Sequence, residues 1–170
     1  YRRQRQMCIR DRNYLVLTGD GSEETEEKLG YYGERIVLKA QALGLNSCWV
    51  AATYSKGACR KACGLEKDEK LACTIALGYG ETQGVPHEGK PLTELFELCA
   101  AAGKAPEWFV KGVEAAALAP TALNRQNFNI VLLEDGRVRL EKQGACAALD
   151  LGIVRYHFEQ GAGKENFEWA

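Results

Sequence analysis

The chain has 170 residues, of which 46% are hydrophobic and 26% are charged, and its formal net charge is −1 at pH 7. This composition is typical of one globular domain with an apolar core. No apolar run reaches the ~20 residues that span a bilayer, and the Arg-rich start lacks the apolar stretch of a secretory signal. We therefore expect neither a membrane protein nor a secreted one.

Seven cysteines lie at irregular spacing. An odd number of cysteines in a chain with ample core does not describe a disulfide scaffold, so we expect a reducing, cytoplasmic location. Cys59 and Cys63 are four residues apart and could face one metal ion together. No histidine lies near them and no second pair follows with zinc-like spacing, so we expect no metal site and interpret them as buried or half-buried thiols.

Residues 1–12, YRRQRQMCIRDR, show no periodicity, and the string MCIRDR resembles translated sequencing-adapter read-through of the kind found in metagenomic assemblies. These residues include five arginines and one aspartate, so the remainder of the chain has a formal charge of −5. We interpret the segment as non-native and expect native sequence from about Asn13. The basic cluster then gives no reason to expect a nucleic-acid partner.

The first half of the chain alternates between strand and helix patterns. Residues 13–18 predict a strand, because they are β-branched or aromatic and end at Gly-Asp-Gly. Residues 22–28 suit either a loop or a first helical turn. A helix is predicted over 30–43, ended by Gly44. Its apolar stripe comprises Tyr32, Ile36, Val37, Leu38, Ala40 and Leu43.

Three further elements are expected before the middle of the chain. Residues 47–52 predict a central strand, because they are short and apolar. Ser55 is placed to cap a short helix that runs to Cys63 and ends at Gly64. A second buried strand is expected within residues 69–79, followed by a glycine-rich loop over 80–90.

The second half predicts helices and a hairpin. Pro91 suits the first turn of a helix to Ala102, and Pro106 suits the start of another. Asp135-Gly136 lies between two strand patterns, 128–133 and 138–141, and is a strong hairpin signal. Residues 147–160 predict an amphipathic helix with Leu149, Ile153 and Tyr156 on one stripe. We therefore expect an α+β fold with a mixed or antiparallel sheet flanked by helices.

A polar loop, APTALNRQNF (119–128), separates an Ala-rich helix from a buried strand. Thr121, Asn124 and Gln126 project polar groups from this short connection, and loops between rigid elements often hold binding groups. Their amides and hydroxyl suit ring carbonyls and nitrogens. The alternative is that Thr121 and Asn124 only satisfy the backbone of the turn.

The order helix, APTALNRQNF, strand resembles the signature AP-S-x-x-N-x-Q-P-W of the nitroreductase family, whose members bind flavin mononucleotide (FMN). Two upstream segments, GYYGERIVLKAQALGLNSCWVAA and GYGETQGVPHEGKPLTEL, resemble further segments of the family in the expected order. EAAALAPTALNRQNF, then LDLGIVRYHFEQGA, resemble a subgroup in which two half-domains are fused in tandem. In that subgroup one chain imitates a dimer, so the complete protein is expected to be a pseudo-dimeric monomer.

The resemblance implies that residues 13–170 form an incomplete nitroreductase-like domain. Residues 13–103 would end the first half-repeat and 104–170 would form the second. The family's N-terminal Arg-x-Ser-x-Arg element, which holds the FMN phosphate and ring, has no match here, and Asn127-Phe128 replaces the usual Pro-Trp. We therefore expect this chain alone to bind FMN weakly or not at all and to be inactive.

The implied activity is that of an enzyme in which NAD(P)H, the cosubstrate, reduces bound FMN, and the flavin then reduces a nitroaromatic, a quinone or a similar small-molecule acceptor. The FMN cofactor carries this reaction, so no catalytic acid–base pair is expected. Two other classes of function stay open, a non-catalytic flavin-binding or sensing module and a ligand-free structural domain. An upstream Arg-x-Ser-x-Arg pattern would favour the enzyme over both.

The resemblance also assigns FMN contacts. It places Thr121, Asn124 and Gln126 at the flavin, and Lys90 suits the phosphate because it precedes a predicted helix start. A solvated surface lysine is the alternative for Lys90. Backbone groups of one strand end would contact the ring, while its larger side chains belong to the core; this strand end comprises Cys48, Trp49, Val50 and Ala51.

His157 lies near Asp150 in the last predicted helix, a pairing that could suggest acid–base chemistry. No serine or cysteine partner motif accompanies the two residues. We interpret His157 as a hydrogen-bonded helix histidine without a catalytic role.

Overall fold

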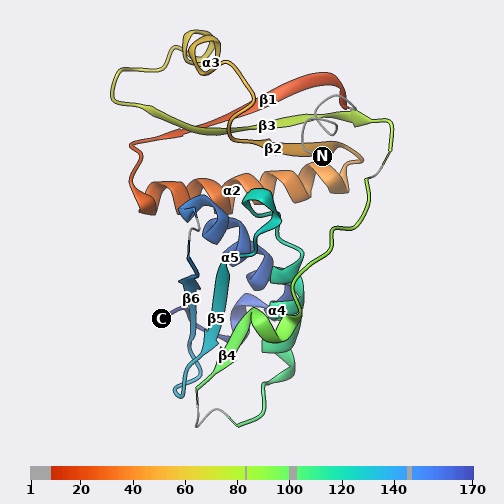
Figure 1. Ribbon diagram of the computed structural model, residues 1–170, viewed down its shortest axis with the longest axis vertical. Coiled ribbons are helices and arrows are strands. Elements are labelled where there is room, and N and C mark those ends of the chain that lie inside the picture. Colours follow the sequence, from red (N-terminus) through yellow and green to blue (C-terminus); the bar gives the residue numbers. More distant parts are fainter. Residues whose placement is uncertain (1–8, 83, 100–102, 145–146) are drawn as a thin grey trace. The chain divides into compact units, whose positions relative to one another are not determined.

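The computed structural model describes residues 9–82, 84–99, 103–144 and 147–170. The chain forms two compact units, Tyr1–Pro86 and His87–Ala170, whose elements are labelled in Figure 1. Each unit combines a three-stranded sheet with helices, so the predicted α+β class is confirmed. None of the helices in the described ranges has the length and apolar character that a membrane span requires.

The sheet of the first unit is antiparallel in the order β1-β3-β2. The central strand is β3 (Lys70–Gly80), which separates β1 (Ile9–Gly19) from β2 (Asn46–Val50). The expectation that the strand around Trp49 is central was therefore wrong. Residues 73–76 of β3 are all buried, as is usual for a strand covered on both faces.

Strand β1 begins earlier than predicted. Ile9 pairs with Gly80 and Arg10 with Tyr79, so the strand includes the last residues of the segment interpreted as non-native. The predicted start at Asn13 was four residues late. Residues 1–8 lie outside the described residues, and the assignment of residues 13–103 and 104–170 to two half-repeats stays a prediction.

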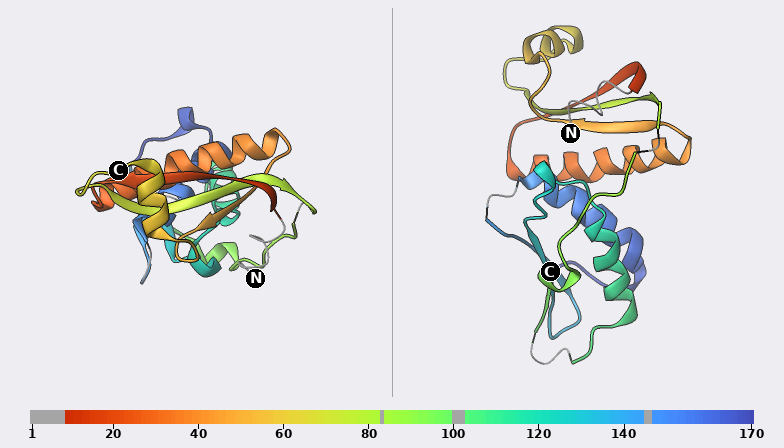
Figure 2. Two further views of the ribbon diagram at one scale, coloured as in Figure 1. Left: turned by 90° about the horizontal axis from the view of Figure 1, so that it is seen from above. Right: turned by 45° about the vertical axis from the view of Figure 1, so that its right-hand side comes forward.

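Helix α2 (Glu23–Ala42) covers one face of this sheet, and α3 (Lys56–Cys63) lies on the other side (Figures 1 and 2). The Ser22 side chain accepts a hydrogen bond from the Thr25 N–H, so the acidic stretch after Ser22 is helical. Acidic residues in a first helical turn also complement the helix dipole. At the other end Gly44 has φ +81°, and the Leu45 N–H bonds to the Ala40 carbonyl at 3.0 Å, as predicted for a glycine-ended helix.

The buried face of α2 differs from the predicted stripe. Val37 and Ala40 are buried, but Tyr32, Ile36 and Leu43 are 57%, 43% and 66% exposed. The helix instead turns Gly30 and Gly33 inward. A Cβ on Gly33 would lie 2.5 Å from Cη2 of Trp49, so glycine lets the indole ring approach the helix. The stripe was predicted from apolar side chains alone, so the glycine positions did not contribute to it. For this reason the pattern indicated the wrong face of α2 as the buried one.

Helix α3 begins and ends where the sequence predicted. The Ser55 hydroxyl accepts a hydrogen bond from the Ala58 N–H at 3.3 Å, and Gly64 ends the helix with φ +61°. Both caps were predicted from the sequence. Cys59 is half-buried as expected, whereas Cys63 is exposed.

The sheet of the second unit is mixed. Strand β5 (Phe128–Leu132) lies between β4 (Phe96–Leu98), which runs parallel to it, and β6 (Val138–Lys142), which runs antiparallel. Gly136 has φ +83° in the turn between β5 and β6. This confirms the hairpin predicted from Asp135-Gly136.

The helix predicted from Pro91 to Ala102 is not present over the described part of that range. Pro91 is followed by a single 3₁₀ turn, η1 (Leu92–Glu94), and then by β4. Leu95 is fully buried, and its carbonyl accepts a hydrogen bond from the Ile130 N–H at 2.9 Å. Pairing with the buried strand β5 outweighs the local helix propensity of this stretch. Residues 100–102 lie outside the described residues.

Helices α4 (Glu107–Ala117) and α5 (Ala148–Ala162) pack against each other beside this sheet (Figure 2). Gly112 of α4 faces the ring of Phe158, where a Cβ would come within 2.5 Å of the ring. Helix α5 is buried over most of its surface, so it is less amphipathic than predicted. Edge-to-face contacts link Phe158 to Phe109 and Phe167, which form part of the core.

Candidate functional site

The loop between α4 and β5 has an unusual backbone. It contains a short 3₁₀ turn, η3 (Ala122–Asn124), and three non-glycine residues with positive φ. These are Leu123 (57°), Asn124 (54°) and Gln126 (48°). Each such residue costs on the order of 1–3 kcal/mol, and strained backbone of this kind gathers at functional sites. The loop therefore needs strong contacts to hold it, and it is the leading candidate for a binding site in the second unit.

Gln126 supplies several of these contacts. Its side chain is 1% exposed. Its Oε1 accepts a hydrogen bond from the Lys90 N–H at 2.6 Å, and its Nε2 donates to the Ala117 carbonyl at 2.8 Å. The Lys90 ammonium donates to the main-chain oxygen of Gln126 at 3.0 Å. Gln126 thus joins the loop, the end of α4 and the segment at Lys90.

Thr121 and Asn124 also bond within the second unit. The buried Thr121 hydroxyl accepts a hydrogen bond from the Gln126 N–H at 3.0 Å, and the Asn124 Nδ2 donates to the Glu88 carbonyl at 2.7 Å. The structure therefore brings Lys90 and the three polar loop residues together. The hydroxyl of Thr121 and the amide of Gln126 are used to shape the loop, and their contact with a ligand stays a prediction.

Asp150 holds the other end of the loop. It lies in the first turn of α5, is 8% exposed, and its Oδ2 accepts a hydrogen bond from the Ala122 N–H at 3.0 Å. In the sequence, Asp150 had drawn attention only as a neighbour of His157 in the same helix. Its sequence signal is weak, because an acidic residue in the first turn of a helix is common for reasons of dipole alone.

Several groups of the loop face outward. Leu118 and Leu123 are 67% and 65% exposed, and Asn124 and Arg125 are exposed as well. The Asn124 amide oxygen and the Arg125 guanidinium form no hydrogen bond with any residue that the structure describes. The loop therefore presents apolar surface, an amide and a positive charge side by side. Arg125 was not singled out from the sequence.

The second set of predicted site residues belongs to the first unit. Cys48 and Val50 are buried on β2 and form an apolar cluster with Ala76, against which Tyr54 packs. The Trp49 Nε1 donates to the carboxylate of the buried Glu34 on α2 at 2.9 Å. The side chain of Cys48 thus lies in the core, as expected, whereas Trp49 is half-buried and packs against Gly33 of α2. Ala51 is exposed just beyond the strand, and the predicted backbone contacts to a flavin are untested.

Burial keeps two ionisable groups of the first unit, a thiol and a phenol, protonated at neutral pH. It raises the pKa of the Cys73 thiol to about 12, so this thiol stays protonated. Burial also raises the pKa of Tyr54, whose hydroxyl oxygen is buried and has no hydrogen-bond partner among the described residues. Both groups therefore stay protonated at neutral pH, and neither is a candidate nucleophile.

No set of three His, Cys, Asp or Glu residues within the described ranges could hold a metal ion. His157 is buried in α5, and its Nδ1 lies 3.2 Å from the Ala115 carbonyl. The interpretation of His157 as a hydrogen-bonded helix histidine is therefore confirmed.

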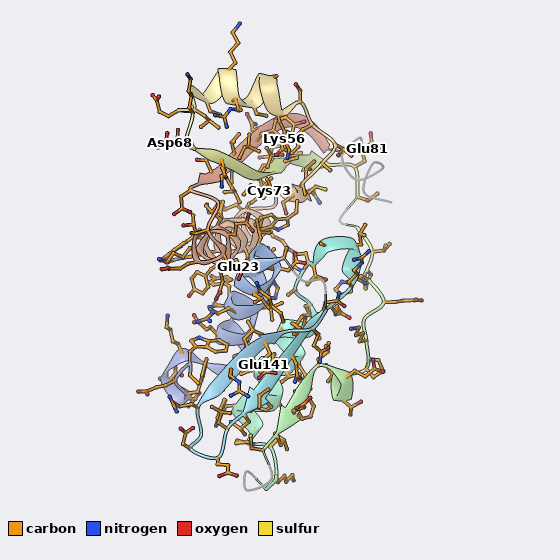
Figure 3. All side chains as sticks on the ribbon, turned by 60° about the vertical axis from the view of Figure 1, so that its left-hand side comes forward. Glu23, Lys56, Asp68, Cys73, Glu81 and Glu141 are labelled. Atoms are coloured by element: carbon orange, nitrogen blue, oxygen red, sulfur yellow. The ribbon has the colours of Figure 1, made fainter. Side chains whose placement is uncertain are left out.

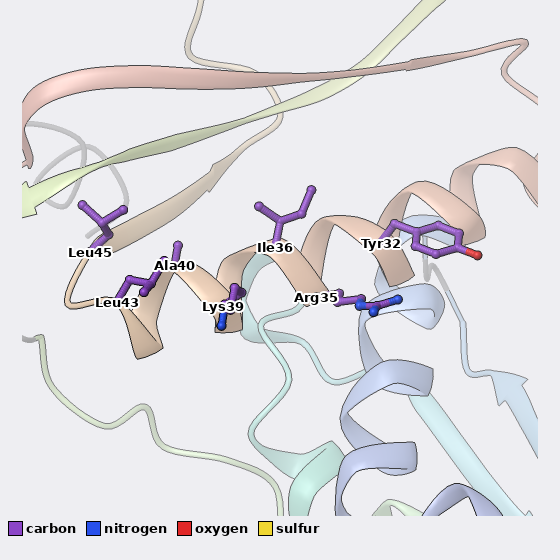
Figure 4. A pocket seen from close by; sticks show the side chains of 7 residues that line it. All are labelled: Tyr32, Arg35, Ile36, Lys39, Ala40, Leu43 and Leu45. Atoms are coloured by element: carbon purple, nitrogen blue, oxygen red, sulfur yellow. The ribbon is translucent and has the colours of Figure 1, made fainter.

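A shallow groove of about 460 Å³ lies along the exposed face of α2 (Figure 4). Its lining is mostly apolar and includes four side chains of the predicted apolar stripe, which are Tyr32, Ile36, Ala40 and Leu43. None of the predicted site residues lines it. The lining residues are Tyr32, Arg35, Ile36, Lys39, Ala40, Leu43 and Leu45.

A family model described as "Putative TM nitroreductase" matches residues 2–162. The crystal structure of a "putative nitroreductase" from Thermotoga maritima is 28% identical to this chain, with a TM-score of 0.71. The match covers 91% of this chain and 63% of that one, so this chain spans less than two thirds of its length. No curated protein matches the sequence.

A second solved structure is an FMN-dependent nitroreductase from Clostridium difficile. It is 22% identical, and the match covers 42% of this chain and 47% of that one with a TM-score of 0.35.

Proposed function

Because this chain belongs to the nitroreductase family whose model matches residues 2–162, we propose that it is part of an FMN-dependent oxidoreductase. In the complete protein, NAD(P)H would be the electron donor, and a nitroaromatic, a quinone or a similar small molecule would be the acceptor. FMN, when bound, supplies the two-electron chemistry. The observation that carries the proposal is the strained loop 121–126, which holds Asn124 outward at the position of the family's polar motif.

The outward groups of this loop fit a flavin. A flavin ring combines an apolar face with polar edges of carbonyls and nitrogens, and Leu123 and Asn124 offer the matching apolar and amide surfaces. The phosphate of FMN requires positive charge, which Lys90 and Arg125 bring to the same loop. Among the side chains of the second unit we therefore assign direct contact to Leu123, Asn124, Arg125 and Lys90.

Thr121 and Gln126 have a different part in this proposal. Their side chains are buried and hydrogen-bonded inside the second unit, so they hold the loop in its strained form. This arrangement fixes the direction of the Asn124 amide before a ligand arrives, which reduces the entropy lost on binding.

The residues of this chain orient the cofactor and exclude water and do not themselves carry protons. The Cys73 thiol is buried and protonated, and His157 is bonded to a helix carbonyl, so neither is placed to transfer a proton. Such a site relies on hydrogen bonds of fixed direction around a reactive cofactor.

FMN titration of the complete protein tests the proposal. We expect the complete protein to purify yellow, and we expect Asn124→Ala to weaken FMN binding by a few-fold to about tenfold, because one neutral hydrogen bond contributes about 0.5–1.5 kcal/mol. Quenching of flavin fluorescence measures the dissociation constant, and NAD(P)H oxidation with a nitroaromatic measures turnover. Cys59→Ser on α3 is the control and should change neither.

Three results would contradict the proposal or a part of it. If the complete protein binds no FMN, it lacks the cofactor that the proposed reaction requires. That result would favour a ligand-free structural domain. If FMN binds but no acceptor is reduced, the protein is a flavin-binding module without turnover. If Asn124→Ala lowers only the melting temperature and leaves flavin content and turnover intact, Asn124 forms the turn and does not contact the flavin.

A further inference from the structure

The carboxylate of Asp150 and the N–H of Ala122 join α5 to the start of the polar loop at 3.0 Å. We infer that Asp150 is a positioning residue for the flavin site: it holds the strained turn at Leu123 and Asn124 so that the Asn124 amide faces the ligand. This inference rests on the proposed function and deepens it. The loop signature of the family, as it matches this chain, does not include Asp150. This residue lies 28 positions after Ala122 in the sequence.

The carboxylate is well suited to hold a backbone N–H. Hydrogen bonds to an ionised acceptor are about twice as strong as those between neutral groups. Asp150 occupies the first turn of a 15-residue helix, where the helix dipole stabilises negative charge. The helix is buried over most of its length, so its first turn is a rigid anchor for the loop.

Asp150 anchors the loop at Ala122, beside Thr121, whose hydroxyl and carbonyl accept hydrogen bonds from the Gln126 and Asn124 N–H groups. The bonds from Asn124 and Gln126 tie the second part of the loop to the main chain at Glu88 and Lys90. The Asp150 bond ties the first part, at Ala122, and the positive-φ residues Leu123 and Asn124 lie between the two anchors. Without the Asp150 bond, the remaining bonds at Thr121 and Glu88 hold the turn less firmly, so it relaxes more readily toward ordinary backbone angles and the Asn124 side chain changes direction.

Asp150 does not itself belong to the ligand-contacting set. It is 8% exposed, and its carboxylate is bonded to the main chain of the loop. Its effect on the ligand is therefore indirect. This distinguishes it from Asn124, which is exposed on the same loop.

Two measurements on the complete protein test the inference. Hydrogen exchange of the peptide that spans residues 119–127 reports how firmly the loop is held, and flavin fluorescence gives the FMN dissociation constant. For Asp150→Ala we expect exchange of this peptide to rise by about tenfold or more and the dissociation constant to rise about tenfold, because a charge-assisted hydrogen bond is lost. Asp150→Asn keeps an acceptor oxygen and should rescue both values to within about threefold of the wild type.

Two further variants separate positioning from stability. Glu159→Ala removes another buried carboxylate of α5, one that accepts a hydrogen bond from Trp169 Nε1 at 2.9 Å. It should lower the melting temperature without faster exchange in the 119–127 peptide. Asp150→Ser keeps a polar group that suits a helix N-terminus but is too short to reach Ala122, so it should loosen the loop even if Asp150→Ala does not fold.

The outcomes are distinct. Unchanged exchange of the loop in both Asp150→Ala and Asp150→Ser overturns the inference, as does equal loosening in Glu159→Ala. A loosened loop with an unchanged FMN dissociation constant overturns only the flavin role of Asp150 and leaves the proposed function standing. A wild-type protein that binds no FMN overturns the proposed function and the flavin role together, whereas the exchange data still decide whether Asp150 holds the loop.

Discussion

Lys90 donates two hydrogen bonds to Gln126. The Lys90 N–H bonds to the Gln126 Oε1 at 2.6 Å, and the Lys90 ammonium bonds to the Gln126 main-chain oxygen at 3.0 Å. The two residues are 36 positions apart, so this contact closes a long segment of the second unit onto its polar loop. It also directs the charge of Lys90 toward the loop that carries Asn124.

Gln126→Ala should destabilise the second unit. The substitution removes a buried amide and leaves the Lys90 N–H without its acceptor, and the Ala117 carbonyl keeps only the contact with His87 Nε2 at 3.2 Å. We expect a loss of roughly 1–3 kcal/mol in the free energy of unfolding, measured by urea denaturation. Gln160→Ala, at an exposed position of α5, is the matched control and should change little. Equal unfolding curves for the two variants would show that the Gln126 bonds do not contribute.

Gly33→Ala should destabilise the first unit. The new methyl group would lie 2.5 Å from Trp49 Cη2 and 3.2 Å from Leu17 Cδ1, so the indole ring must move. Overpacking of this kind costs about 1–3 kcal/mol, of which the better helix propensity of alanine offsets up to about 1 kcal/mol. Thermal denaturation followed by tryptophan fluorescence measures the loss.

Gly57→Ala is the control for this substitution, and it should raise the stability of the protein where Gly33→Ala lowers it. Gly57 lies in α3, and no atom is within 4 Å of a Cβ placed there. Replacing it should stabilise α3 by about 0.5–1 kcal/mol. A stabilised Gly33→Ala protein would mean that Trp49 does not pack against α2 as described.

Native thiols should differ in their rates of alkylation. Cys63 is exposed at the end of α3, whereas Cys73 lies within the sheet of the first unit with 3% of its surface exposed (Figure 3). Because burial raises the pKa of Cys73 to about 12, its reactive thiolate is scarce at pH 8. Iodoacetamide at pH 8 should modify Cys63 and leave Cys73 intact, as read by peptide mass spectrometry. Similar rates for both thiols in the folded protein would contradict the position of β3.

The start of α2 should lose stability in acid. Hydrogen bonds from the Ser22 N–H and hydroxyl to the Asp20 carboxylate lower the pKa of Asp20 from 3.8 to about 2. A carboxyl with a lowered pKa in the folded state stabilises it above pH 3.8, and this contribution is lost as pH falls toward 2. We expect the amide signals of the first turn of α2 to shift with a midpoint near pH 2. In Asp20→Asn this transition should be absent, and its persistence there would assign it to another group.

Local signals predicted the ends of several elements. These signals act through hydrogen bonds or backbone angles within a few residues. They are Ser55 and Gly64 at the ends of α3, Gly44 after α2, and Asp135-Gly136 in the hairpin. Such features do not depend on the rest of the fold, so the sequence is enough to predict them. The order of helix and strand patterns, together with the hairpin signal, was likewise sufficient to predict the α+β class.

The sequence by itself thus determined the local turns, the caps and the composition of the polar loop. Only the tertiary structure decided that β3 is central, that β4 replaces a predicted helix, and that α2 buries its glycine face. It also decided that Gln126 bonds to Lys90 and that Asp150 bonds to Ala122. These outcomes depend on partners that are distant in the sequence, and the free energy of burying a strand or pairing a buried amide exceeds the small propensities that a local pattern records.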